Sequence, residues 1–267
     1  LSVGTLSVNA AGSLYCDSYV ISGSAIFSLA TGCTMRLGSP GGISVSGATG
    51  NIQVSGLRTF SVNTIFIYNG TTNQVTGNGL PATITSLTIN NTGLAGNNTV
   101  NLTTTNTTTA VLNLTAGLFA AGAGQQLNIS NGGTVNPVAG NFVTGATCGI
   151  INFLGSGSFT ASCTPYDVYT SGGVNFGLTP IVVTIQNGGS FRINTGGFAS
   201  TNGPFYATGS TLIYNTGLAG YGIGVEWVNG VTSGRGVPHH VTILASGTTI
   251  LFGGALTPRT MTGNMTI

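Results

Sequence analysis

The chain has 267 residues and contains no lysine. Only 3% of its residues are charged, against roughly 25% in ordinary globular domains. The net charge of +2 and five scattered arginines argue against nucleic-acid binding, which needs clustered cations. A hydrophobic content of 41% argues against disorder. Apolar runs of only two to four residues argue against membrane insertion.

The predicted elements are short β-strands separated by Gly, Asn or Ser turns. No window has the apolar spacing of an amphipathic helix. Polar and apolar residues alternate instead, in chain order, over 43–46, 51–54, 87–90, 111–114, 182–185 and 241–244. Short alternating runs with a turn about every 8 to 12 residues predict an all-β chain.

Similar phrases recur along the chain at a separation near 155 residues. Segment 35–42 matches 191–197, segment 66–69 matches 212–215, and segment 81–87 matches 238–244. This repetition predicts one continuous domain over 1–267, built from two copies of a unit at approximately 1–135 and 136–267.

Arg36 and Arg192 fall at matched positions, where we expect them to bond to carbonyls at a corner without binding a ligand. With no initiator Met, signal peptide or apolar tail, the chain is expected to be a fragment of a longer protein.

Many short, similar strands favour a right-handed parallel β-helix, that is, a β-solenoid. Apolar residues would fill its core, and stacked Asn and Thr ladders outside would satisfy one another's polar groups. About 22 residues per coil gives roughly 12 coils and a rod roughly 55–60 Å long. The alternative is a set of β-sandwich repeats, whose paired strands would normally be joined by closely spaced hairpin turns.

The four cysteines fall into two local pairs, at 16 and 33 and at 148 and 163. An even number in a chain of this composition predicts disulfides Cys16–Cys33 and Cys148–Cys163 and an oxidising compartment. Buried free thiols are the alternative. Neither pair has the CxxC spacing of a zinc or redox site.

Two stretches carry a resemblance to a known class of protein. They are Leu37-Gly38-Ser39-Pro40-Gly41-Gly42-Ile43 with its continuation to residue 93, and the region 205–245 that contains Tyr214-Asn215-Thr216-Gly217. Both resemble the β-strand repeat regions of very large secreted surface proteins of the Bacteroidetes. The resemblance implies an extracellular or cell-surface location, export by type IX secretion, and in some members a role as mobile adhesins of gliding motility. The C-terminal sorting domain typical of those proteins is missing from this sequence.

The segment 217–240 concentrates the rare residue types, since it holds the only Trp, the only Glu and both His. Aromatic rings beside polar groups are what a sugar-binding patch needs, which makes Tyr221, Trp227 and Arg235 candidate ligand contacts. The competing interpretation is that Trp227 caps the core while Glu226 pairs with Arg235.

Catalytic chemistry finds little support in the sequence. The acids Asp17, Asp167 and Glu226 do not occupy equivalent repeat positions, and no GxSxG elbow orients a serine. Calcium-binding Asp-rich nonapeptides are absent. If His239 and His240 lay in a strand, their rings would point to opposite faces, which argues against joint metal ligation, and turn residues after Pro238 are the favoured interpretation. We therefore expect no catalytic, metal or cofactor site. Ice binding by the threonine run 103–109 is a minor alternative.

The favoured function is a structural and adhesive segment of a long extracellular filament that attaches to surfaces or other cells. A solenoid carbohydrate-binding module is the first alternative, and a β-helix polysaccharide-degrading enzyme the second. The expected partners are neighbouring repeats of the same chain, surface polysaccharide, other copies of itself, and the secretion or motility machinery through parts outside this sequence.

Overall fold

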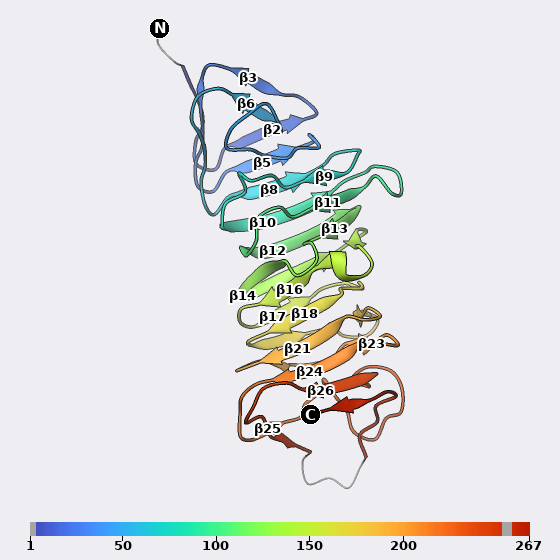
Figure 1. Ribbon diagram of the computed structural model, residues 1–267. Helices are drawn as coiled ribbons and strands as arrows, with labels where there is room; N and C mark the ends of the chain where they lie inside the picture. The colour runs from blue at the N-terminus through green and yellow to red at the C-terminus, as the bar shows by residue number, and fades with distance from the viewer. Residues whose placement is uncertain (1–3, 253–257) are drawn as a thin grey trace.

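The computed structural model describes residues 4–252 and 258–267 as an elongated stack of coils (Figure 1). The coils make about 11 turns of a parallel β-solenoid, with the first turn at one end of the column and the last at the other. One 3-10 turn, η1 (Ala146–Cys148), is the single helical element of the described residues. The predicted β-solenoid fold is therefore confirmed.

The longest sheet runs the length of the molecule, with one strand contributed by each successive coil. In order it comprises β2 (Ser13–Asp17), β5 (Thr34–Leu37), β8 (Ile65–Tyr68), β10 (Thr83–Asn90), β12 (Thr107–Ala116), β14 (Gln126–Pro137), β16 (Ile150–Phe153), β18 (Asp167–Thr170), β21 (Ser190–Asn194), β24 (Thr211–Asn215), β26 (His240–Ile243) and β28 (Met265–Thr266). A branch leaves it at β14 and comprises β17 (Gly157–Phe159), β19 (Gly173–Asn175) and β22 (Phe198–Ala199).

Shorter sheets form the other sides of the coils. They are β1 (Thr5–Val8), β4 (Ile26–Leu29) and β7 (Arg58–Phe60); β15 (Asn141–Phe142), β13 (Leu118–Ala120), β11 (Thr99–Asn101) and β9 (Gln74–Val75); β3 (Ile21–Gly23) and β6 (Ile52–Val54); β20 (Thr184–Ile185) and β23 (Phe205–Tyr206); and β25 (Tyr221–Gly222) and β27 (Ile250–Leu251).

Every pairing between these named strands is parallel, which excludes the β-sandwich alternative. Among the described residues, an antiparallel contact occurs as the isolated bridge between Asn229 and Arg259. No described helix is long and apolar enough to span a membrane.

Register places like side chains above one another in the core. Met35 pairs with Phe66, Phe66 with Leu87, and Leu87 with Leu112, and all four side chains are fully buried. A second column contains Ile151, Val168, Phe191, Leu212 and Val241. Because a strand alternates its side chains between two faces, the residues beside each inward one point outward, and many of them are polar, such as Thr34 and Arg36 beside Met35.

The outward polar residues form ladders that cross several coils. Asn113 donates to Thr88, Asn136 donates to Asn113 over 2.9 Å, and Thr160 donates to Asn136 over 2.7 Å. Asn215 likewise donates to Asn194. Amides and hydroxyls thus satisfy one another without charge, which confirms the predicted Asn and Thr ladders.

The predicted disulfides are wrong, because all four cysteines are buried free thiols. In the β2–β5 register Thr34 lies beside Ser13, so Cys33 and Cys16 are four positions apart along the strands, about 13 Å. Cys148 lies in η1 and Cys163 forms an isolated bridge with Val183, so the two are not opposite each other in a strand pair. Burial raises the pKa of Cys16 to about 11 and that of Cys148 to about 12, so both stay protonated.

Candidate functional site

Coil length varies, and the two longest turns create the irregular surface of the molecule. The paired residues of successive coils are 17 positions apart from Ile150 to Asp167, but 31 apart from Thr34 to Ile65 and 29 apart from Thr211 to His240. Each of these two long turns buries one charged side chain and opens a hollow beside it. They are named here the arginine turn (38–64) and the glutamate turn (216–239).

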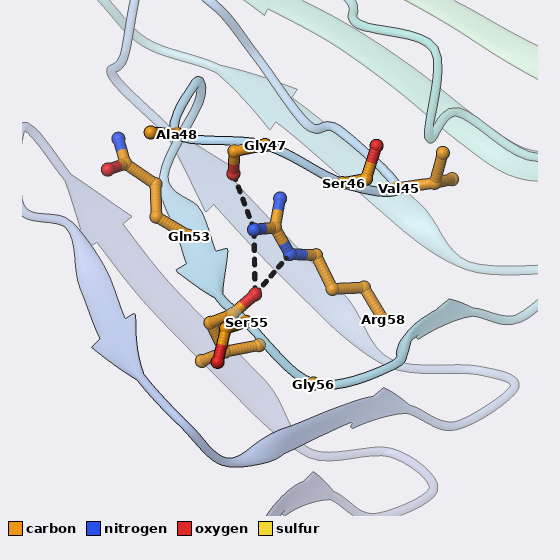
Figure 2. Close-up of a pocket in the computed structure, with 9 residues that line it drawn as sticks. Val45, Ser46, Gly47, Ala48, Gln53, Ser55, Gly56 and Arg58 are labelled. Carbon is orange, nitrogen blue, oxygen red and sulfur yellow. Dashed lines mark hydrogen bonds between the residues drawn. The ribbon is translucent and has the colours of Figure 1, made fainter.

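The arginine turn is fastened by Arg58, whose side chain is only 6% exposed. Its guanidinium donates to the carbonyls of Val54, Ser44 and Gly47, and Val54 accepts from both Nε and Nη2. Figure 2 shows Arg58 and its bond to the Gly47 carbonyl. The hollow beside it measures about 420 Å³. Four of the five guanidinium N–H groups thus donate to backbone carbonyls.

Those carbonyls explain how a buried cation is held without a carboxylate. Burial lowers the pKa of Arg58, but an arginine remains protonated in a protein. Four charge-assisted hydrogen bonds replace the lost hydration and fix the Ser44–Gly47 strip against β6. Arg58 therefore stabilises its own turn, and a single guanidinium N–H remains for any ligand.

The glutamate turn is organised around Glu226, which is fully buried. Its Oε1 accepts hydrogen bonds from the Gly224 amide at 2.8 Å, the Tyr221 hydroxyl at 3.2 Å and the Tyr214 hydroxyl at 3.5 Å. The hydroxyl of Tyr206 donates to the Glu226 backbone carbonyl at 3.0 Å. Three tyrosines from three different strands therefore converge on one acidic residue.

The other carboxylate oxygen, Oε2, is buried and has no hydrogen-bond partner among the described residues. Burial raises the pKa of Glu226, and the bonds from Gly224 and Tyr221 and the charge of Arg259 offset that rise only in part. Arg259 lies near enough to act through its charge, but its own described hydrogen bond goes to the Ile223 carbonyl. The turn thus holds an acidic group that is only partly satisfied.

A groove of about 390 Å³ lies on the surface beside this cluster. Gly196–Ala199 line one side of it, and Leu218, Tyr221 and Gly224 line the other. Gly224 is exposed, and a Cβ added there would lie 2.9 Å from Glu226 Oε2. Only the glycine backbone therefore separates the unpartnered oxygen from the groove.

The three candidate ligand contacts of the sequence do not form one surface patch. Tyr221 is 7% exposed and lines the groove. Trp227 is buried in the core, where its Nε1 donates to the Thr260 carbonyl at 2.8 Å and its ring packs on Phe252. Arg235 donates to the carbonyls of Phe176, Gly203 and Ile181 and lies over the Phe205 ring. The expected Glu226–Arg235 pair is wrong, because Arg235 is held by backbone carbonyls.

The acids lie on different coils and bond to different groups. Asp17 accepts from Arg36 at 2.6 Å and from Asn69, and the bond from Arg36 is the main reason why its pKa lies below the usual range. Asp167 accepts from the amide and hydroxyl of Ser190, although burial raises its pKa. The described residues contain no group of three or more His, Cys, Asp or Glu placed to hold a metal.

Arg36 and Arg192 are matched in structure as well as in sequence. Arg36 lies over the ring of Tyr15, its register partner, and Arg192 lies over the ring of Tyr169, also its register partner. Their hydrogen bonds go to Asp17 and to the Asn194 side chain. The expected bonds to corner carbonyls are absent for both guanidinium groups among the described residues.

Two minor points of the sequence can be placed in the structure. His239 lies in a bend after Pro238 and outside β26, in line with the interpretation as a turn residue, and its ring centroid is 4.2 Å from that of His240. The threonine run 103–109 offers no flat exposed array, since Thr107 and Thr109 point inward and are fully buried.

Comparison with family models, with curated proteins and with solved structures found no match in any of the three. The site residues that sequence reasoning missed are Arg58, Phe198 and Gly224. An arginine flanked by a long glycine-rich turn was the one available signal, and a Phe or a Gly in a chain of this composition gives none.

Proposed function

We propose that this chain is a stiff structural segment of a long extracellular surface protein, which carries adhesive contacts away from the cell. The observation that supports this most directly is the ladder of twelve parallel strands from β2 to β28, which continues through every coil. Each coil hydrogen-bonds to the coils above and below it, so bending the column would strain many bonds at once.

The surface of the column suits an extended fibre. With few charges, neighbouring rods repel one another weakly, so lateral contact between copies is favoured. Large apolar side chains are exposed singly along the column, including Tyr19, Leu57, Leu94 and Val138. Scattered apolar groups and amide ladders provide many weak contacts, which is the mode of attachment expected of a filament.

Two measurements test this proposal. Small-angle scattering of the purified chain should give an elongated particle, with a long dimension of at least roughly 55 Å for twelve strands spaced about 4.8 Å apart. Antibodies raised against the chain should label intact cells of its source, and electron microscopy should place the label on filaments. Labelling that requires permeabilised cells would overturn the extracellular assignment and leave the fold untouched.

A further inference from the structure

The groove beside the glutamate turn lies where one sheet stops. The branch β17–β19–β22 ends at β22, because β25, the strand of the glutamate turn that lines the groove, pairs with β27 and not with β22. The amides of Phe198 and Ser200 donate to carbonyls of the preceding coil. Since successive N–H groups of a strand alternate in direction, the Ala199 N–H and carbonyl face the groove. Ala199 is only 3% exposed, however, so the backbone groups that a ligand can reach lie mainly at the exposed glycines of the other side, Gly220, Gly222 and Gly224.

An exposed aromatic ring stands at the same edge. Phe198 is 45% exposed, which is unusual for Phe in this chain, whose largest buried side chains include seven phenylalanines. Its register partner is Gly173, where an added Cβ would lie 2.8 Å from the ring. The ring thus rests on bare backbone on one side and presents its remaining surface to solvent. A flat ring held in this way can stack on the apolar face of a sugar.

The described residues that line the groove carry no charge. Leu218 forms an apolar rim at 42% exposure, and glycines form much of the floor. Beneath one of them, Gly224, lies the unpartnered Glu226 Oε2. An aromatic platform, an uncharged rim and a few polar backbone groups suit a neutral, polyhydroxylated ligand better than an ionic one.

We propose that this groove binds a neutral polysaccharide, with a pyranose ring stacked on Phe198 and its hydroxyls hydrogen-bonded to backbone groups of the exposed glycines that line the groove. This inference does not rest on the proposed function, because the groove belongs to one turn and the column to the whole ladder. A fibre segment with this groove would have one defined contact along an otherwise unspecific surface.

Titration calorimetry of the whole chain tests the inference with cellohexaose, xylohexaose, mannohexaose and chitohexaose as probes. At least one neutral probe should bind. Phe198→Ala should weaken that binding at least tenfold, while Phe198→Trp should retain it because the stacking surface grows. Tyr19→Ala is the matched control, since Tyr19 is an aromatic residue with 78% exposure far away at the first coils, and it should change nothing.

Two further probes separate the occupants that the groove could accept. A uronic-acid hexasaccharide should bind weakly or not at all, because no described cation lines the groove. A hexapeptide of alternating Thr and Val tests strand addition at the β22 edge. The inference is overturned if no neutral probe binds, if Phe198→Ala and Tyr19→Ala bind equally, or if the acidic sugar or the peptide binds better than every neutral probe. Melting curves of each variant separate loss of binding from loss of fold.

Discussion

The turn from β8 to β10 and the turn from β24 to β26 begin alike and end differently. Each follows a fully buried tyrosine at an equivalent point of the ladder, Tyr68 in one and Tyr214 in the other. Paired residues are 21 positions apart across the first turn and 29 apart across the second. The Tyr68 hydroxyl donates to the Thr76 carbonyl, whereas the Tyr214 hydroxyl donates to the Glu226 carboxyl.

The short turn keeps its buried polar centre neutral and complete. Gln74 donates to the carbonyls of Leu37 and Ser39 and accepts from the Gly70 amide and the Asn91 side chain. The glutamate turn substitutes a carboxyl group whose second oxygen has no described partner. The two turns therefore differ in what lies at the buried centre, an amide with all its partners at Gln74 and a carboxyl group with one unpartnered oxygen at Glu226. Unpartnered buried amide atoms occur elsewhere, for example at Asn69 in the short turn, so the distinctive feature of the long turn is the buried acid beside a groove.

The largest effect should come from placing a carboxylate in the short turn. In Gln74→Glu, an ionised oxygen would face the Leu37 and Ser39 carbonyls in a fully enclosed position. We expect a loss of about 3–5 kcal/mol in the free energy of unfolding at neutral pH, typical of an uncompensated buried charge. Urea denaturation measures this, and the loss should shrink at acidic pH as the carboxyl is protonated. A variant as stable as the wild type would show that the short turn is not specifically neutral.

Removing the buried cation of the arginine turn should have the next largest effect. Arg58→Ala leaves three carbonyl groups without their donor, those of Ser44, Gly47 and Val54. Because this turn lies near solvent, water replaces part of the loss, and we expect about 2–3 kcal/mol. Arg192→Ala is the matched control, since Arg192 is partly exposed and has one described side-chain bond, and it should cost less than about 1 kcal/mol. Limited proteolysis within 44–50 should accelerate only in the Arg58 variant.

Glu226 should make the stability of the fold depend on pH in the opposite sense to a carboxyl group whose pKa is lowered by folding. Because burial raises the pKa of Glu226, its contribution to stability is complete below the ordinary glutamate pKa and is lost as the pH rises through the raised value. Tyr206, Tyr214, Tyr221 and Arg259 face the carboxyl, and the three tyrosines stay neutral across that range because burial raises their pKa values.

Glu226→Gln should therefore melt higher than the wild type at pH 7.5, and the gap should close near pH 4, about the ordinary pKa of the free side chain. Each unit by which the folded-state pKa is raised is worth about 1.4 kcal/mol at the higher pH. Thermal melts at a series of pH values measure this directly. A gap that is constant with pH would mean that folding does not change the pKa of Glu226.

The sequence was sufficient for the architecture because the alternation of Val, Ile, Leu and Phe with Thr, Asn and Ser is a property of each strand by itself. The amide ladder through Asn113 and Asn136 follows once the strands stack in parallel. The cysteine pairing failed for a related reason. Closeness in sequence says nothing about register, and register sets Cys16 and Cys33 four positions apart.

The site was less predictable because it depends on how long each turn is. The sequence left Trp227 open between a ligand contact and a cap of the core, and the structure buries it, while Phe198, for which the sequence offered no signal, lies at the surface. Neither placement follows from local composition. Both follow from the glutamate turn, which interrupts the branch at β22 and folds its own aromatic residue inward.

The smallest effect, and the one that links the carboxyl to the groove, concerns two neighbouring glycines. A Cβ at position 224 would press on Glu226 Oε2, whereas a Cβ at position 222 would enter open space. Gly224→Ala should therefore cost about 1 kcal/mol and alter the pH dependence of melting, because the carboxyl must move. Gly222→Ala should stay within about 0.5 kcal/mol of the wild type and keep its pH profile. Identical profiles for the two variants would mean that the carboxyl does not reach the groove wall, and the contrast between the two turns would then be one of length alone.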